Sequence, residues 1–233
     1  MTNSAEGLKR RAAEAALAQV KSGMVLGLGT GSTVAHLLDL LAEAIAARAL
    51  TDIVGVPTSA QTERRAQALG IPLVGLADRE GIDLTIDGAD EISPELDLIK
   101  GGGGALLREK MVAQASNRVL IIADAAKKVG RLGSTFALPI EVVRWGWESH
   151  VRFLSGWGAQ AALRLNPDGK PVASDNGQIL LDCRFPAGIE DPAALEDALT
   201  RRAGVVETGL FLGLAHEALV ATARGIESIR RPA

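Results

Sequence analysis

The chain alternates short apolar runs with amphipathic stretches, and this alternation constrains its fold more than any other feature. Each apolar run is continuous, as in strands buried on both faces, and each intervening stretch spaces its apolar residues like one face of a helix. The predicted strands are 24–29, 52–57, 72–76, 84–90 and 118–124, and the predicted helices are 5–21, 32–49, 58–70 and 105–116. This order predicts an α/β fold in which helices cover both faces of a parallel sheet.

The pattern changes after about residue 130, where two hairpin signals precede a well-marked helix. The helix is predicted over 191–204, with Asp191 as its N-cap, Pro192 at its first position and Gly204 at its end. The hairpin signals are Asp168-Gly169 and Asn176-Gly177. The other elements predicted here are strands 137–143, 161–166 and 178–185 and a helix over 147–159. This second part therefore reads as a smaller antiparallel α+β unit.

We expect two domains. Strands predicted at 205–211 and 217–225 are expected to rejoin the first sheet or its edge. The sheet domain is therefore assigned to 1–130 with 206–233, and the small domain to 131–205.

Composition excludes several partners. The chain has 233 residues, of which 47% are hydrophobic, enough for a sizeable core. Its net charge is -3, with no run of like charges, so neither nucleic acid nor an anionic membrane surface is an expected partner. No stretch of about 18 apolar residues predicts a transmembrane helix, and the first residues lack the apolar run of a secretory signal. We expect a cytoplasmic protein.

Cysteine and histidine usage offers no metal or disulfide chemistry. The single cysteine, Cys183, excludes an intrachain disulfide, and its apolar neighbours predict a buried, inert thiol. The three histidines, His36, His150 and His216, lack the spacing of metal ligands, so no metal site is predicted.

A glycine-rich turn joins the first predicted strand to the following helix. It reads GLGTGST at 27–33. Backbone N–H groups at the start of a helix favour an anion, and the hydroxyls of Ser32 and Thr33 add donors. A dinucleotide fingerprint would need glycine at position 32. A single phosphate group is therefore favoured over a dinucleotide, and a purely structural tight turn is the remaining alternative.

Residues 87–110 combine acids, a cation and bare backbone in one short segment. Asp87, Asp90 and Glu91 stand at the end of a predicted strand, where acids are disfavoured. Turn chemistry would explain one aspartate. The run of four glycines at 101–104 contributes no packing. Together these features favour a functional site, in which Glu91 is the weakest member, with a solvated position as its alternative.

Two side chains near the glycines are candidates for catalysis. Lys100 precedes them and would stabilise an oxyanion, although an exposed surface lysine is the alternative. Glu109 lies about one turn into the following helix and is a candidate general base or a plain exposed helix residue. Its neighbours Arg108 and Lys110 are expected to face solvent.

Two further lysines are candidate phosphate partners. Lys127 follows the predicted strand 118–124 and would pair with a phosphate or with a substrate oxygen, and Lys9 in the first helix is the more speculative phosphate partner. In parallel sheets ligands bind beyond the carboxyl ends of the strands, where the glycine turn, the aspartates and Lys127 all fall. The sequence therefore predicts one site built from several strand ends.

Four blocks of the sequence together resemble the ribose-5-phosphate isomerase family, type A. The blocks are GLGTGST at 27–33, DGADE at 87–91, KGGGGALLREK at 100–110 and ADAAKK at 123–128. Their order and spacing match, and the later pieces SDNGQILLD and GVVETGLF extend the resemblance to nearly the whole chain. One departure is a fourth glycine, Gly104, followed by Ala105, where the family often has KGGGAA. A small residue is kept, so we expect only a looser start to the helix.

The resemblance implies an enzyme that interconverts D-ribose 5-phosphate and D-ribulose 5-phosphate in the non-oxidative branch of the pentose phosphate pathway, without metal or organic cofactor. It implies a Rossmann-like main domain, a smaller ferredoxin-like α+β domain and a homodimer or homotetramer. By motif position, Glu109 is the proton acceptor. The implied substrate-binding residues are Thr30, Gly31, Ser32, Thr33, Asp87, Gly88, Ala89, Asp90, Lys100, Gly101, Gly102, Gly103 and Lys127.

The residue chemistry fits such a reaction. Moving a carbonyl between C1 and C2 needs a base that takes a proton from carbon and returns it to the neighbouring carbon, and Glu109 is the candidate. Lys100 and the glycine N–H groups would stabilise the enediolate oxygen. Asp87 would handle hydroxyl protons and ring opening, and Asp90 would orient sugar hydroxyls. The glycine turn would hold the phosphate, and this remote binding would position the reacting carbons.

Two other functions are considered. A sugar-phosphate sensor on a related fold would call for a separate helix-turn-helix segment, and none is evident in the sequence. A transferase that uses Glu109 as a covalent nucleophile on an acyl-CoA would call for a larger site for the nucleotide. The three tryptophans fall together in the predicted small domain. We expect them to pack in its core or at a subunit interface: Trp145, Trp147 and Trp157.

Overall fold

The computed structural model describes residues 4–231, which form two compact units. Among the described residues, the first unit comprises 4–89, 108–127 and 214–231, and the second comprises 90–107 and 128–213. The domains predicted from sequence, 1–130 with 206–233 and 131–205, differ from these units at 90–107, 128–130 and 206–213, which fall in the second unit.

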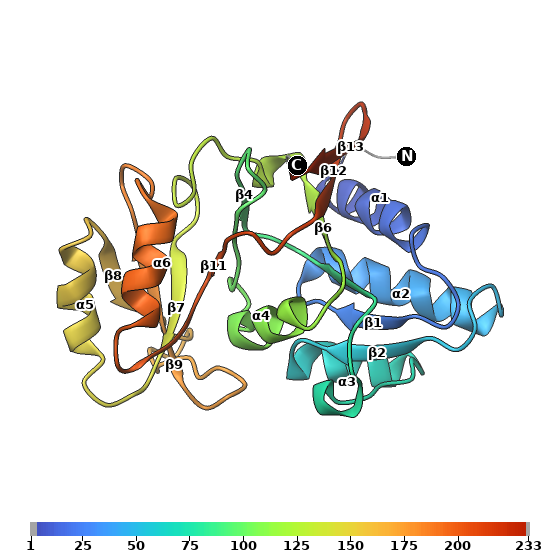
Figure 1. The fold of residues 1–233 in the computed structure, drawn as a ribbon, viewed down its shortest axis with the longest axis horizontal. Coiled ribbons are helices and arrows are strands. Elements are labelled where there is room, and N and C mark those ends of the chain that lie inside the picture. The colour runs from blue at the N-terminus through green and yellow to red at the C-terminus, as the bar shows by residue number, and fades with distance from the viewer. Residues whose placement is uncertain (1–3, 232–233) are drawn as a thin grey trace. The chain divides into compact units, whose positions relative to one another are not determined.

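The first unit is built on a six-stranded sheet with the order β13-β12-β6-β3-β1-β2 (Figure 1). All neighbouring strands are parallel except β12 and β13, which form an antiparallel hairpin at one edge. The strands are β1 (Val25–Leu28), β2 (Val54–Pro57), β3 (Leu84–Asp87), β6 (Val119–Asp124), β12 (Glu217–Thr222) and β13 (Gly225–Arg230). The predicted parallel α/β sheet is confirmed.

Helices cover both faces of this sheet. Side chains alternate along β1, so Leu26 and Leu28 join the larger core with α1 and α2, while Val25 lies on the opposite face near Val112 of α4. The helices are α1 (Ala5–Leu17), α2 (Ser32–Ala46), α3 (Ala60–Ala68) and α4 (Leu106–Gln114), with short 3-10 turns η1 (Leu76–Asp78) and η2 (Ala125–Lys127). No helix within residues 4–231 is long and apolar enough to cross a membrane.

One predicted strand is wrong. Residues 72–76 contribute only a single bridge, from Leu73 to Gly55. Proline at position 72 has no N–H for a ladder. Beyond Val74 the Asp78 carboxylate accepts a hydrogen bond from the Gly75 N–H at 2.8 Å and turns the chain into η1. Edge strand β13 was not predicted.

The second unit contains a four-stranded antiparallel sheet with the order β10-β7-β9-β8. Its elements are β7 (Leu138–Val142), α5 (Glu148–Ser155), β8 (Gln160–Leu163), β9 (Ile179–Arg184), α6 (Pro192–Thr200) and β10 (Val205–Thr208). This β-α-β-β-α-β order is that of ferredoxin-like units and confirms the predicted α+β part. Cys183 lies in its core, so its predicted burial is confirmed, and burial together with the Asp182 charge raises the pKa of the thiol.

Local signals in this unit are also confirmed. Gly169 and Gly177 have positive φ values of 75° and 79°, which tight turns require and side chains disfavour. Helix α6 starts where predicted, because the Asp191 carboxylate accepts a hydrogen bond from the Ala194 N–H at 3.0 Å and Pro192 occupies the first turn.

A second, three-stranded sheet in this unit was missed. Its order is β11-β5-β4, with β4 (Glu91–Ile92), β5 (Leu98–Ile99) and β11 (Leu210–Phe211). Segment 205–211 was expected to rejoin the parallel sheet, and this is wrong: β10 pairs with β7, and β11 pairs with β5. Two-residue strands are too short to carry a periodic signal.

Candidate active site

The turn after β1 is shaped by close contact with Asp87 at the end of β3. A side chain at Gly29 would place its Cβ 2.2 Å from Asp87 Oδ1 and 2.6 Å from Asp87 Cα, so only glycine fits there. Gly31 has a φ of +118° and precedes α2 without a side-chain cap. The first turn of this fifteen-residue helix therefore presents backbone N–H groups that its N-cap residue does not occupy.

Asp87 ties two strand ends together. Its Oδ1 accepts hydrogen bonds from the N–H of Thr30 at 3.0 Å and from the N–H of Gly88 at 2.7 Å. The residue is only 2% exposed. The structure thus brings together two blocks, 27–33 and 87–88, that lie far apart in the sequence. Two backbone N–H groups from different strand ends therefore hold the Asp87 carboxylate in place.

Sequence reasoning missed a cluster of hydroxyl groups behind this turn. Thr30 Oγ1 lies 2.8 Å from Thr58 Oγ1, 3.1 Å from Thr62 Oγ1, and donates to Ser59 Oγ at 2.8 Å. Thr62 in turn donates to the Gly29 carbonyl at 2.7 Å. Both the hydroxyl and the N–H of Thr30 are therefore engaged within the protein, and the N–H groups and hydroxyls of Ser32 and Thr33 are better placed to meet an anion.

In the second unit, Asp90 holds the glycine run. Its Oδ2 accepts a hydrogen bond from the Gly102 N–H at 2.8 Å. The run turns back on itself, since the Gly104 N–H donates to the Gly101 carbonyl at 2.9 Å. Gly101 and Gly104 have φ values of +101° and +80°, which explains why glycine stands at both positions.

Lys100 is buried just before these glycines. It is 3% exposed, and its backbone N–H donates to the Gly209 carbonyl at 2.9 Å, which extends the pairing of β5 with β11. Its Nζ lies 5.4 Å from the centre of the Phe211 ring, within range of a cation–π interaction. The alternative of an exposed surface lysine is therefore wrong.

Glu91 is a structural anchor, and the option of a solvated side chain is wrong. The residue is 0% exposed. Its carboxylate accepts hydrogen bonds from the N–H groups of Gly133, Thr135 and Phe136 and from the Thr135 hydroxyl. A buried carboxylate needs such partners to offset its desolvation, and here they fix the loop before β7.

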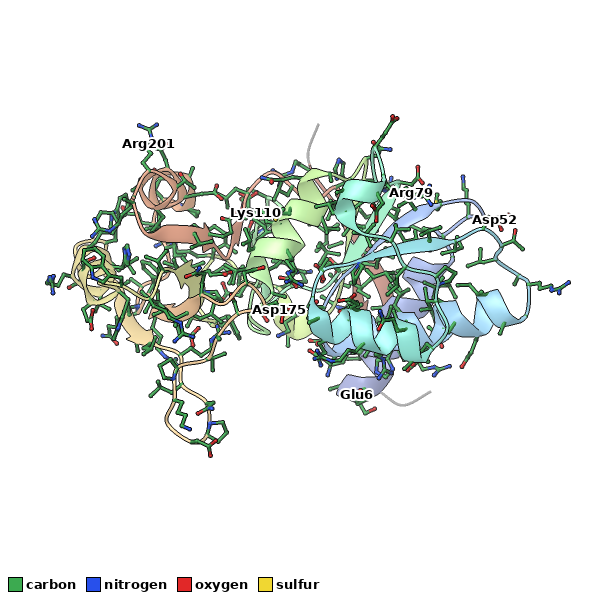
Figure 2. The ribbon with its side chains drawn as sticks, turned by 90° about the horizontal axis from the view of Figure 1, so that it is seen from below. Glu6, Asp52, Arg79, Lys110, Asp175 and Arg201 are labelled. Atoms are coloured by element: carbon green, nitrogen blue, oxygen red, sulfur yellow. The ribbon has the colours of Figure 1, made fainter. Side chains whose placement is uncertain are left out.

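Glu109 lies on α4 and is 4% exposed, so the alternative of a plain exposed helix residue is wrong. Lys110, which was expected to face solvent, is also 4% exposed; Figure 2 shows it on the same helix. Arg108 is half-buried. Adjacent buried Glu and Lys side chains are unusual in an amphipathic helix. Their burial distinguishes Glu109 from a surface glutamate.

The two candidate phosphate lysines lie in different surroundings. Lys127 ends η2 and is half-buried, after a turn in which Asp124 Oδ1 accepts from the Ala126 N–H at 2.9 Å. Lys9 on α1 forms an ion pair with Glu6 at 2.7 Å. Lys9, together with His36, lowers the pKa of the Glu6 carboxyl.

The predicted site residues divide between the units. The turn 29–33, Asp87 to Ala89, Glu109 and Lys127 belong to the first unit, and Asp90 and the segment 100–104 belong to the second. Among residues 4–231, no group of three or more His, Cys, Asp or Glu side chains could hold a metal ion. Fold and side chains thus define an α/β protein with a glycine-rich turn between a strand end and a helix N-terminus, buried carboxylates and a run of four glycines.

Comparison with known proteins identifies the family. The family described as ribose 5-phosphate isomerase A (phosphoriboisomerase A) matches residues 54–225. Ribose-5-phosphate isomerase A of Chloroflexus aurantiacus is 51% identical over 228 residues, covering 98% of this chain and 95% of that protein. The chain belongs to the ribose 5-phosphate isomerase A family.

Solved structures agree with this assignment. A D-ribose-5-phosphate isomerase in complex with phospho-erythronic acid superposes with a TM-score of 0.95 at 38% identity, covering 98% of this chain and all of that one. The ribose 5-phosphate isomerase of Plasmodium falciparum gives a TM-score of 0.94 at 36% identity, with 98% and 100% coverage. The predicted α/β fold class is confirmed over the whole described chain.

Proposed function

We propose that this chain interconverts D-ribose 5-phosphate and D-ribulose 5-phosphate through an enediolate, with Glu109 as the base. The observation that carries the proposal is membership of the ribose 5-phosphate isomerase A family across 98% of the chain. The reaction belongs to the non-oxidative branch of the pentose phosphate pathway.

The proton transfers balance without a cofactor. The Glu109 carboxylate takes the proton from C2 of the open-chain aldose, and the C–H electron pair forms the C1–C2 double bond while the carbonyl π electrons move to O1. A proton passes from the C2 hydroxyl to O1, for which Asp87 is the proposed carrier. The protonated Glu109 then returns its proton to C1, and O2 becomes the ketone oxygen. One carboxylate thus serves as base and acid in turn.

The other side chains bind and stabilise. Lys100 and the N–H groups of the glycine run are the proposed donors to the enediolate oxygen, where preorganised donors contribute most. Asp90 is proposed to orient the sugar hydroxyls with the carboxylate oxygen that Gly102 does not occupy. The first turn of α2, at Gly31 to Thr33, is the proposed phosphate site, with Lys127 as a further partner.

The test replaces Glu109 with an amide of the same shape. We expect Glu109→Gln to lower kcat for ribose 5-phosphate by roughly three orders of magnitude, because positioned general bases contribute about 100- to 10,000-fold, while affinity for the sugar phosphate changes little. The matched control is Glu43→Gln on the exposed face of α2, which should be fully active. Near-normal turnover by Glu109→Gln would remove Glu109 as the base.

We further infer that the chain assembles as a homodimer or homotetramer and acts in the cytoplasm. Trp145 supports self-association, because it is 91% exposed in the loop after β7 and tryptophan is enriched in protein–protein interfaces. Trp147 packs partly against the core of the second unit, and Trp157 is 38% exposed.

A further inference from the structure

Arg164 makes hydrogen bonds to the glycine run that no sequence motif predicts. It follows β8, and Asp182 of β9 holds its guanidinium in a two-point ion pair, with Nε–Oδ2 at 2.9 Å and Nη2–Oδ1 at 2.5 Å. The remaining nitrogen, Nη1, donates to the carbonyl of Gly101 at 3.2 Å and to the carbonyl of Gly102 at 3.0 Å. Arg164, Asp182 and the glycine run all belong to the second unit.

These contacts fix the orientation of two peptide planes. In a trans peptide the C=O and the following N–H point in opposite directions. The peptide between Gly101 and Gly102 is held on both sides, because Arg164 binds its carbonyl and Asp90 accepts from its N–H at 2.8 Å. The next peptide is held by its carbonyl alone, so the N–H of Gly103 points away from Arg164.

The Gly103 N–H is therefore a hydrogen-bond donor that the fold itself does not use. Gly103 is exposed, and no residue within 4–231 accepts a hydrogen bond from its N–H. Consecutive glycines have many accessible conformations. The direction of the Gly103 N–H therefore depends on the hydrogen bonds that other residues make to the glycine backbone. A hydrogen bond from a cation to the carbonyl also polarises the peptide and strengthens its N–H as a donor.

We propose that Arg164 is a positioning residue that aims and polarises the Gly103 N–H toward the oxygen on which negative charge develops during isomerisation. This inference deepens the proposed function and depends on it. Arg164 touches the glycine backbone, and its charge is balanced by Asp182, so it acts through the peptide and not as an anion-binding side chain. The alternative is an ion pair that only stabilises the second unit.

The two roles differ in which ligand they affect. Phospho-erythronic acid carries a carboxylate where an enediolate would carry charge, whereas ribitol 5-phosphate keeps the phosphate and hydroxyls without a carbonyl or a charge at C1. We expect Arg164→Met to lower kcat for ribose 5-phosphate by about 10- to 100-fold, less than the roughly 100- to 1,000-fold that follows loss of an oxyanion donor itself. Affinity for phospho-erythronic acid should fall by a similar factor, and affinity for ribitol 5-phosphate should stay within about 3-fold of wild type.

Companion variants separate geometry from folding. Arg164→Lys should restore part of kcat, because an ammonium can donate to one carbonyl but cannot make the two-point pair with Asp182. Asp182→Asn should lower kcat and the affinity for phospho-erythronic acid, as Arg164→Met does, but by a smaller factor. The matched control is Arg201→Met, which removes an exposed arginine from an ion pair with Asp197 at the end of α6 (Figure 2) and should leave both affinities unchanged.

Calorimetric affinities, kcat and Tm decide the outcome. Selective loss of phospho-erythronic acid binding that parallels kcat supports the inference. A lower Tm for Arg164→Met with wild-type kcat and affinities, or equal weakening of both ligands, overturns it. If Arg164→Met does not fold, the same comparison of the two ligands is made on Arg164→Lys and Asp182→Asn. Failure of the proposed function is distinct: wild type and Arg201→Met would not isomerise ribose 5-phosphate at all.

Discussion

Adjacent residues take opposite tasks around the glycine run. Asp90 binds the Gly102 N–H directly. Glu91, the next residue, holds the loop that carries Phe136, whose Cζ lies 2.9 Å from the place where a Cβ of Gly102 would stand. Successive side chains of an extended chain point to opposite faces. One carboxylate therefore holds the glycine backbone and its neighbour holds the wall beside it.

Gly29 offers a test of the contact between the two strand ends. We expect Gly29→Ala to destabilise the protein by about 1–3 kcal/mol, because its Cβ would collide with the Asp87 backbone as well as its carboxylate. Activity should fall with it, since Asp87 must move. Denaturant unfolding and initial rates measure the two effects. Gly130→Ala is the control, with nothing within 4 Å of its Cβ; equal stability of the two variants would refute the expectation.

At the scale of single residues, the sequence identifies the motif residues better than the residues that position them. Asp87 and the glycines stood out because they are poor choices for a strand or a helix. Ser59 did not, because a serine before a helix is explained as its cap, which it also is. The contact of Ser59 with Thr30 depends on the pairing of β1 with β2, and the contact of Arg164 with Gly102 depends on the register of β8 with β9. The local sequence pattern specifies neither pairing.

At the scale of elements, the edge hairpin β12–β13 is fastened by a charged cluster. Glu217 on β12 accepts hydrogen bonds from Ser228 at 2.6 Å and from Arg118, and lies 3.4 Å from Arg230 on β13. Burial raises the pKa of Glu217, but the Ser228 hydroxyl and the two arginines outweigh it, so the net pKa lies below its usual 4.5. The cluster joins the edge hairpin to the residue before β6.

The lowered pKa predicts how stability depends on pH. The folded state favours ionised Glu217, so its contribution is complete above about pH 4.5 and is lost as pH falls through the lower folded value. We expect Glu217→Gln to cost about 1–2 kcal/mol near neutral pH, and the difference from wild type to shrink in acid. Urea unfolding across this range tests it; a difference that grows on acidification would contradict the assignment.

The pattern of elements was predictable where periodicity had room to show. Strands of four to six residues and helices of eight or more were located from sequence, apart from β13. Ile226 and Ile229 stand three positions apart, which is not the two-residue period of a strand, and both are at least partly exposed. The two-residue strands β4 and β5 are too short to show a period, and β11 lies within the predicted strand 205–211 but pairs with β5, far along the chain.

At the scale of the whole molecule, each unit has a core of its own. The first packs α1, α2 and α3 on the parallel sheet, and the second packs α5 and α6 on the antiparallel one. Catalytic candidates belong to both, and the large exposed apolar residue Trp145 belongs to the second. The second unit therefore combines a share of the proposed chemistry with the surface that best supports self-association.

Self-association is tested by mass in solution. We expect sedimentation to give a multiple of the 24.2 kDa chain mass, and Trp145→Glu to shift the protein toward monomer, because a buried charge would replace a large apolar contact. Arg79→Glu, an exposed change in the first unit, is the control and should keep the wild-type mass. A wild-type monomer at every concentration would refute the oligomer. A Trp145→Glu protein with unchanged mass would instead move the interface elsewhere on the chain, since a glutamate could not remain in a packed apolar contact without loosening it.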